Sequence, residues 1–394
     1  RIDKQALLDQ KGSLEHTVNE RQAALERSED ALRTSEHSNT TLRDANQSMG
    51  AQHLVWQQES IRLNREYTEL ATHLKTIENS TIFRATRPLV HSKMFIDRLL
   101  GRGSAKPAHA AAAPVATPVT PSAHPVDVIV PVYRGLADTQ LCVDSVLASP
   151  LATPYRLIVI NDCSPEPAVT EWLRQRAAGE PRMLLLENEE NLGFVGTVNR
   201  GMALSGDNDV LLLNSDTEVA NDWLDRIRKA AYSDRKVASV TPFSNNATIC
   251  SYPLFCKGND LPAGYTTASL DALCAATNPG ISVDVPTGVG FCMYIRRDSL
   301  QDVGLFDTEH FGKGYGEEND FCQRAANKGW RNLHNLDTFV LHTGGVSFGD
   351  SKSPREQAAM EMLRKLHPKY ETNVLAFLQK DPGLPYRLAL DVAR

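Results

Sequence analysis

The chain has 394 residues, of which 41% are hydrophobic, so its length allows about two or three domains with at least one sizeable core. Its 42 lysines and arginines against 48 acidic residues give a formal net charge of -6, which argues against a protein that binds nucleic acid along its whole length. Its seven dispersed cysteines contain no CxxC pair, which disfavours a zinc site and a disulfide framework and fits a reducing, cytoplasmic compartment.

Residues 1–80 carry apolar side chains at heptad spacing. One column holds Leu7, Leu14, Leu42, Met49, Trp56, Leu63, Leu70 and Ile77. A second column, offset by four positions, holds Val18, Leu25, Leu32, Tyr67 and Leu74. Two such columns predict the seam of a coiled coil. Polar residues in the second column would weaken the pairing of the helices or specify its register. The alternative is a single amphipathic helix packed on a neighbouring domain.

Residues 81–125 differ in composition from the segment before them. Between residues 81 and 106, six basic residues stand against one acidic residue and alternate with apolar ones. This pattern predicts a short amphipathic helix on an anionic membrane surface, and a solvated helix or one docked on the next domain fits equally well. Residues 104–125 are rich in alanine and proline, which predicts a linker and a domain boundary near residue 125. Because the chain begins at Arg1 without a charged-then-apolar leader, we expect a longer natural protein.

From residue 126 onward, apolar strands alternate with helices. The predicted strands are VDVIVPVY, YRLIVIND, MLLLEN and DVLLLNSD, separated by helical patterns near 138–147, 169–177 and 198–204. This alternation predicts an α/β domain over residues 126–394, with a mostly parallel sheet flanked by helices and a helical C-terminal tail. Ligands of such sheets bind beyond the carboxyl ends of the strands, where polar pairs such as Asn161-Asp162 and Glu187-Asn188 follow the apolar runs.

The fourth predicted strand ends in Asn214-Ser215-Asp216. A carboxylate at a strand end can hold Mg²⁺ or Mn²⁺, which prefer one or two carboxylates together with substrate phosphate oxygens. The same residues would also serve as the cap of the helix that follows. Asp216 alone therefore leaves both a metal site and a helix cap open.

Four segments occur in the order in which family 2 glycosyltransferases of the GT-A fold carry their sugar-nucleotide motifs. These segments are PVYRG, NDCS, NLGFVGTVNRG and NSDT, and the resemblance extends from about residue 126 to residue 349. Two motifs lack their usual first acid, because Asn161 and Asn214 stand there. The resemblance implies that Asp216 holds Mn²⁺ or Mg²⁺ on the diphosphate of the donor.

The resemblance also implies a set of donor-binding residues. Base and ribose would contact Pro131, Tyr133 and Asp162, and the rest of the donor site would contain Asn191, Gly193, Asn199, Asn214 and Ser215. The glycines of NLGFVGTVNRG form neither GxGxxG nor a P-loop, so dinucleotide-binding and P-loop interpretations are poor. Turn formation and close helix packing explain these glycines as well as ligand contact does.

The segment around Glu317-Glu318-Asn319-Asp320 resembles the acceptor segment of the family, in which an acidic helix start reaches the active site. Glu318 stands where the family usually has its aspartate base, and the resemblance extends the catalytic set to Glu317 and Asp320. The assignment of the base between Glu317 and Glu318 stays open, because a glutamate reaches about one methylene further. Without the resemblance, acidic residues that favour a helix N-terminus would explain the pattern.

His342 follows another apolar strand and resembles the late histidine that completes the metal site of the family. A metal-bound histidine needs an acceptor for its second ring nitrogen, which the sequence does not identify. The stretch TPFSNNATICSYP resembles a loop of bacterial polysaccharide glycosyltransferases, in which Asn245 and Asn246 would bind a sugar or form a turn.

Together these inferences predict an inverting, metal-dependent glycosyltransferase. It would transfer a hexosyl or deoxyhexosyl group from a nucleoside-diphosphate sugar to a glycan or lipid-linked glycan, in bacterial O-antigen or capsule synthesis. We expect self-association through the coiled coil, peripheral contact with the inner face of the bacterial inner membrane, and no nucleic acid partner. The alternative is a coiled-coil scaffold whose sheet domain binds a nucleotide or glycan without turnover. A nicotinamide-dependent oxidoreductase is disfavoured, since no glycine fingerprint follows the first strand.

Overall fold

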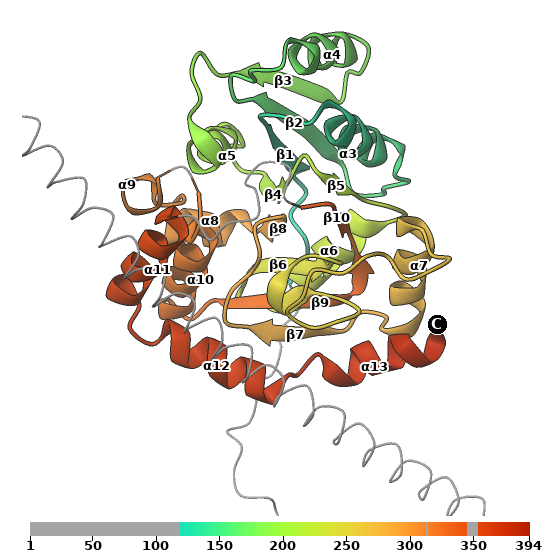
Figure 1. Ribbon diagram of the computed structural model, residues 1–394, viewed down its shortest axis with the longest axis vertical. Helices are drawn as coiled ribbons and strands as arrows, with labels where there is room; N and C mark the ends of the chain where they lie inside the picture. Colours follow the sequence, from blue (N-terminus) through green and yellow to red (C-terminus); the bar gives the residue numbers. More distant parts are fainter. Residues whose placement is uncertain (1–118, 313, 345–353) are drawn as a thin grey trace, which may run out of the picture. The chain divides into compact units, whose positions relative to one another are not determined.

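The computed structural model describes residues 119–312, 314–344 and 354–394 (Figure 1). The predicted coiled coil, the basic segment and most of the linker fall in residues 1–118, outside the described residues. All described residues belong to one compact unit that begins at Ala112. Within this described part of the chain, no helix combines the length and the apolar character needed to cross a membrane.

Eight of the described strands form one large sheet with the order β3-β2-β1-β4-β8-β6-β9-β7. Its strands are β1 (Val126–Val132), β2 (Tyr155–Asn161), β3 (Met183–Glu187), β4 (Asp209–Leu213), β6 (Val237–Phe243), β7 (Ser282–Val285), β8 (Cys292–Ile295) and β9 (Arg331–Phe339). The pairings give β1, β2, β3, β4, β6 and β9 one direction, whereas β7 and β8 run the opposite way. The predicted α/β fold with a mostly parallel sheet is therefore confirmed.

Helices cover both faces of this sheet (Figure 1). One face packs against α3 (Leu136–Ala148), α4 (Pro167–Ala178) and α6 (Trp223–Ala231), and the other packs against α5 (Gly193–Leu204), α8 (Arg297–Val303) and α10 (Glu317–Asn327). The remaining helices are η1 (Thr248–Cys250), α7 (Thr267–Thr277), α9 (Thr308–Phe311), α11 (Pro354–Leu366), α12 (Tyr370–Lys380) and α13 (Leu384–Ala393). Burial on both faces explains why the strands are continuous apolar runs instead of alternating ones.

The first strand shows how the two faces divide. Val128 and Val130 belong to the core under α3 and α4, whereas Ile129 belongs to the core under α5. Gly201 allows α5 to approach this strand, because a Cβ there would lie 2.7 Å from Cγ2 of Ile129. This glycine therefore serves close helix packing, one of the two roles open from the sequence.

A buried histidine on β9 links stability to pH. His334 is 1% exposed, its ring meets Phe243 edge-on at 4.5 Å, and its Nε2 has no hydrogen-bond partner among the described residues. Burial, assisted by the charge of Arg387, lowers the pKa of His334 to about 3. The unfolded chain, with an ordinary imidazole, binds the proton first, so the free energy of unfolding falls as the pH falls from about 6.5 towards 3.

In wild type, His334 lowers the free energy of unfolding by about 1.4 kcal/mol for each pH unit below about 6.5. We expect this contribution to be absent in His334→Leu. Urea unfolding at a series of pH values measures the free energy of unfolding of wild type and variant. The other titrating groups contribute equally to both proteins, so they cancel in the difference. Parallel pH dependences for the two proteins would contradict the assignment.

Candidate active site

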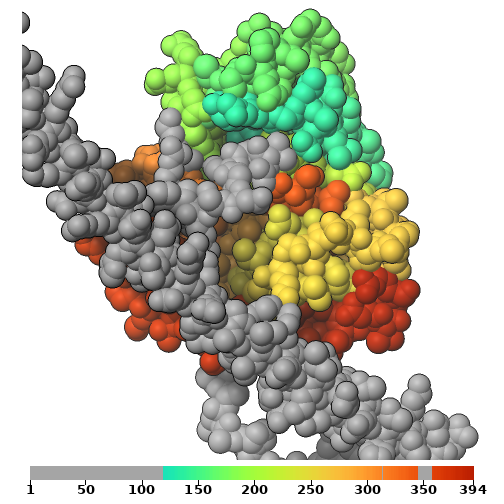
Figure 2. All heavy atoms as spheres, in the orientation of Figure 1, coloured from blue at the N-terminus to red at the C-terminus, as the bar shows by residue number. Residues whose placement is uncertain are grey.

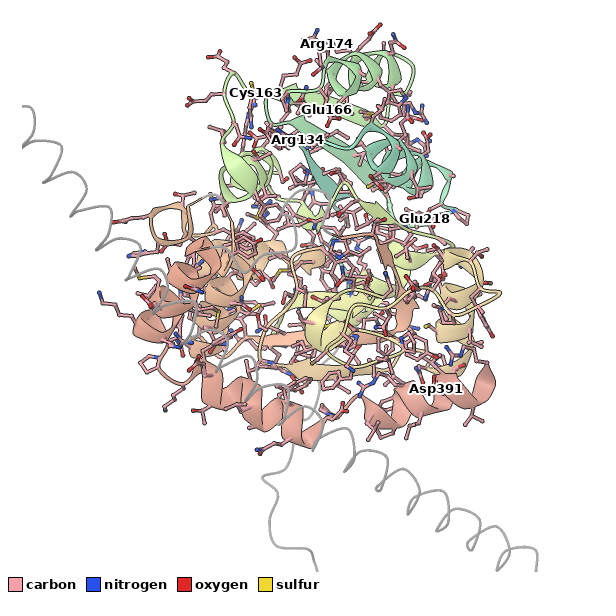
Figure 3. All side chains as sticks on the ribbon, in the orientation of Figure 1. Arg134, Cys163, Glu166, Arg174, Glu218 and Asp391 are labelled. Atoms are coloured by element: carbon pink, nitrogen blue, oxygen red, sulfur yellow. The ribbon has the colours of Figure 1, made fainter. Side chains whose placement is uncertain are left out.

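The carboxyl ends of the parallel strands β1, β2 and β3 lie at one edge of the sheet, as predicted. Val132 pairs with Asn161, and Asn161 pairs with Glu187, so the residues that follow these strands start side by side. Figure 3 shows Arg134, Cys163 and Glu166 gathered at this edge. A hydrogen bond of 3.2 Å from the backbone N–H of Gly135 to Oε2 of Glu166 joins the loops after β1 and β2.

Asp162 at this edge organises the start of α5. Its Oδ1 accepts from Nδ2 of Asn188 at 2.7 Å and from the backbone N–H of Leu192 at 2.8 Å. Its Oδ2 accepts from the backbone N–H of Gly193 at 2.9 Å, and Gly193 has a φ of 72°, which favours glycine. Because a carboxylate has about four acceptor positions, little of Asp162 remains for a ligand.

The other predicted donor residues divide between exposed and engaged side chains. Both atoms of the Asn199 amide bond the backbone of Phe306, at 2.8 and 3.1 Å, so this side chain joins α5 to the loop after α8. Pro131, Tyr133, Asn191 and Ser215 are half-buried around the strand ends. The guanidinium of Arg134 lies 5.2 Å from the centre of the Tyr133 ring. The ligand contacts expected of these residues remain predictions.

A second, two-stranded sheet brings Asp216 and His342 together. Strand β5 (Thr217–Glu218) pairs antiparallel with β10 (Leu341–His342), and the backbone N–H of Thr343 donates to the carbonyl of Asp216 at 2.9 Å. This pairing places Nε2 of His342 3.4 Å from Oδ1 of Asp216 and 3.5 Å from Nδ2 of Asn214. In Figure 2, the orange-red segment around β10 lies at the surface, between the green first part of the unit and the yellow segments.

The loop after β6 fixes the orientation of His342. The ring donates from Nδ1 to the carbonyl of Asn246 at 2.7 Å, and it stacks on Phe291 at 5.2 Å. The side chain of Asn245 holds the backbone of His342 on both sides, accepting from its N–H at 2.8 Å and donating to its carbonyl at 3.0 Å. Asn246 therefore supplies the acceptor that the sequence did not identify, and Nε2 of His342 is left facing Asp216.

The contact between His342 and Asp216 changes the titration of the ring. Burial lowers the pKa of His342, but the hydrogen bond and the charge of Asp216 outweigh it, so the pKa is raised. In the part of the chain that the structure describes, no three or more histidine, cysteine or acidic side chains are grouped so that they could hold a metal ion by themselves. A cation at this pair would therefore need further oxygens from a substrate, which is how Mg²⁺ is commonly bound.

The acidic start of α10 contains two carboxyl groups in different surroundings. Glu317 is 5% exposed and its Oε2 has no hydrogen-bond partner among the described residues, whereas Glu318 is half-buried. Burial and the charge of Glu318 hold the pKa of Glu317 well above its ordinary value. Burial also raises the pKa of Glu318, and backbone N–H groups at the helix start, including that of Asn319, act against it. Glu317 is thus the carboxyl group that is more strongly driven to the protonated form.

Asp320 has a different environment from the two glutamates. Its Oδ2 accepts from Nε of Arg324 at 2.7 Å, and its Oδ1 lies 2.8 Å from Nε2 of His367. With both oxygens paired in a buried position, Asp320 braces α10 against the segment between α11 and α12. Its catalytic role remains a prediction, and in the structure its side chain holds α10 in place through Arg324 and His367.

The loop between β7 and β8 connects the two groups of candidate residues. Thr287 donates from Oγ1 to Oδ1 of Asn319 at 2.7 Å, beside Glu318. Phe291, four residues further on, stacks on His342 and accepts at its carbonyl from the backbone N–H of Asn214 at 2.8 Å. Four residues span at most about 14 Å, so one short loop borders both the Asp216–His342 pair and the start of α10.

Comparison with known proteins identifies part of this unit. Residues 127–304 match the family described as Glycosyl transferase family 2. The match extends from β1 to the end of α8 and covers less than half of the chain. The matched family is the one that the motifs in the sequence resemble. Glu317, Glu318 and His342 lie beyond the matched residues.

Individual relatives are more distant. An uncharacterized protein, y4gI of Sinorhizobium fredii, is 29% identical over 281 residues, which cover 68% of this chain and 29% of that protein. The chain thus spans less than a third of the length of this relative. Two solved structures are similar at 16% identity. They are GalNAc-T7 with UDP, GalNAc and Mn²⁺ (TM-score 0.47, covering 66% of this chain and 52% of that one) and the mannosyltransferase PcManGT from Pyrobaculum calidifontis with GDP-Man and Mn²⁺ (TM-score 0.41, 70% and 88%).

Proposed function

We propose that the chain is an inverting, metal-dependent glycosyltransferase, which moves a hexosyl or deoxyhexosyl group from a nucleoside-diphosphate sugar to a glycan hydroxyl. The observation that carries this proposal is the Asp216–His342 pair, which lies one short loop from the acidic start of α10. Retention with two displacements would need a second nucleophile. A single displacement needs only one base for the acceptor and one site for the leaving diphosphate.

The donor atoms at the Asp216–His342 pair fit a divalent cation. Since Nδ1 of His342 donates its proton to a carbonyl, Nε2 is free to offer an electron pair beside the Asp216 carboxylate. Asp216 and His342 would hold Mn²⁺ or Mg²⁺, which supplies positive charge against the diphosphate that leaves. Asn214, whose backbone is held by Phe291, borders the same site.

Glu318 takes the role of the general base in this proposal. Its carboxylate accepts the proton of the acceptor hydroxyl as the new C–O bond forms at the anomeric carbon and the bond to the diphosphate breaks. Glu317 remains protonated beside it, because its burial is deeper and it has an unpartnered oxygen among the described residues. Because the pKa of Glu318 is raised, it lies closer to neutral pH, where a general base transfers protons most effectively.

The wider setting of the enzyme belongs to the same proposal. We assign it to bacterial surface-polysaccharide synthesis, of O-antigen or capsule, at the cytoplasmic face of the inner membrane. The basic, amphipathic composition of residues 81–106 and the heptads of residues 1–80 support membrane contact and self-association. The acceptor in this setting is a glycan or a lipid-linked glycan.

Release of nucleoside diphosphate tests the activity. The chain is incubated with a panel of UDP- and GDP-sugars, with Mn²⁺, with Mg²⁺ or with EDTA, and thermal shifts are recorded in parallel. We expect one donor to raise the melting temperature only with metal and to be turned over. If every donor and acceptor tried binds without turnover, the alternative of a non-catalytic scaffold is favoured. Asn161 and Asn214 would then mark positions at which the acidic residues of the family motifs have been lost.

Asn245 offers a test of the metal site. Asn245→Ala removes both bonds to the backbone of His342, and we expect the affinity for Mn²⁺ with nucleoside diphosphate to fall about 10- to 100-fold. Calorimetric titration measures the affinity. Asn278→Ala is the matched control, because Asn278 is also a buried asparagine that donates to a backbone carbonyl, that of Leu336. Equal affinities for the two variants would contradict the role of Asn245.

A further inference from the structure

The C-terminal helices contact the start of α10 at a position that the family match does not reach. The hydroxyl of Tyr370, the first residue of α12, donates to Oδ1 of Asn319 at 2.9 Å. Thr287 donates to the same oxygen at 2.7 Å from the loop between β7 and β8. Nδ2 of Asn319 in turn lies 3.4 Å from Oε1 of Glu318. Two hydroxyl donors from different elements thus meet on one amide beside the proposed base.

These contacts select one orientation of the Asn319 amide. With the hydroxyl groups of Tyr370 and Thr287 at the oxygen of Asn319, its nitrogen faces Glu318. A hydroxyl group can also accept, so the contact with Glu318 decides between the two orientations of the amide. The reversed amide would direct its oxygen at the carboxylate of Glu318, so that two acceptors would face each other. The amide N–H favours the ionised form of Glu318, which is the form that accepts a proton from the acceptor.

Tyr370 is held firmly enough to act in this way. It is 8% exposed and packs with Phe311, Ala359 and Leu363 in a core between α9, α11 and α12. His367, three residues earlier, pairs with Asp320, the residue that follows Asn319 on α10. Burial and the charge of Glu318 raise the pKa of Tyr370, so its hydroxyl stays protonated throughout the working range of pH.

The charged and titratable groups around Glu318 come from α10, from α12 and from the segment between α11 and α12. They are Glu317, Asp320 with its partners Arg324 and His367, Cys322 and Tyr370. The loop between β7 and β8 contributes Thr287, which has no charge.

We propose that Tyr370 is a positioning residue for the Glu318 base, which it orients and keeps ionised through the side chain of Asn319. This inference rests on the proposed function, in which Glu318 accepts the proton. It gives the C-terminal helices a role in the reaction, since α12 completes the surroundings of the base from outside the matched domain.

The test compares Tyr370→Phe with Tyr252→Phe. Tyr252 is also buried, and its hydroxyl also ties a C-terminal helix to the unit, through Oδ1 of Asp391 on α13. We expect Tyr370→Phe to lower the rate of nucleoside diphosphate release about threefold at pH 6, with the KM for the donor unchanged. The deficit should shrink as the pH rises, because Glu318 then ionises without the amide. Tyr252→Phe should show no such pH dependence.

A double-mutant cycle separates action through Asn319 from a general packing effect. In an Asn319→Ala background, Tyr370→Phe should have no further effect on the acidic limb of the pH profile. A shift that persists in this background, or an acidic limb that Tyr370→Phe leaves in place, would overturn the inference.

Carbon-13 NMR of glutamate-labelled protein gives a readout that needs no donor. The signal of Glu318, assigned by its loss in Glu318→Gln, should titrate at higher pH in Tyr370→Phe and in Asn319→Ala than in wild type. An unchanged titration of Glu318 in both variants would also overturn the inference. If Glu318→Gln itself retains transfer, the proposed base is wrong; if it abolishes transfer and Tyr370→Phe changes nothing, only the role of Tyr370 fails.

Discussion

Glu318→Gln is expected to lower the rate of sugar transfer by about 10²- to 10⁴-fold, the range that a general base contributes. The amide has nearly the shape of the carboxyl group but accepts no proton from the acceptor hydroxyl. Donor binding should persist, since the Asp216–His342 pair is untouched. Nucleoside diphosphate release with acceptor, beside a thermal shift with donor and metal, measures both quantities.

Glu317→Gln is the matched control for this prediction. Because burial keeps Glu317 protonated, a neutral glutamine should replace it with a change of less than about tenfold in rate. The reverse result, with Glu317→Gln inactive and Glu318→Gln active, would move the base to Glu317.

The pH dependence of wild type follows from the raised pKa of Glu318. The protonated form of Glu318 is inactive, so activity falls as the pH falls. Because burial raises the pKa of Glu318, this acidic limb lies at higher pH than that of an ordinary glutamate. The profile of kcat/KM for the acceptor reports this limb in the free enzyme. Because Glu317 stays protonated, Glu317→Gln should leave this limb in place, and a limb that moves to lower pH would contradict a neutral Glu317 in wild type.

Asp216→Asn is expected to abolish metal-dependent transfer, by about 10³-fold, with the fold intact. The amide keeps the size of the side chain but loses the negative charge that would hold the cation beside His342. Loss of the Mn²⁺-dependent thermal shift, with an unchanged circular dichroism spectrum, is the expected measurement. An active, well-folded variant would exclude the metal role of Asp216.

Glu218→Gln provides the matched control, two residues further along the chain. The Glu218 carboxylate accepts a hydrogen bond from the hydroxyl of Thr267 at the start of α7, and among the described residues its side chain makes no hydrogen bond to His342. We expect this variant to retain metal-dependent transfer. Protons should compete with Mn²⁺ in wild type as well, because the contact with Asp216 raises the pKa of His342 and a ligand histidine must be neutral.

Local sequence patterns predicted most of the sheet but few of its contacts. The runs at β1, β2, β3 and β4 were readable because strands buried on both faces must be apolar throughout. The C-terminal half was less readable, since β7 and β8 are short, run against the other strands and lack a repeated strand-helix pattern. The role of Gly201 against Ile129 likewise depends on which helix packs on which strand.

The sequence by itself determined the α/β class, the polar residues at the strand ends and the acidic start of α10, because burial and helix electrostatics leave local patterns. Only the tertiary structure decided which of these side chains remain available. It uses Asp162 and Asn199 to hold backbone, joins Asp216 to His342 through β5 and β10, and supplies the carbonyl of Asn246. A backbone carbonyl is the same at every residue, so a contact made across 96 residues leaves no mark in the sequence.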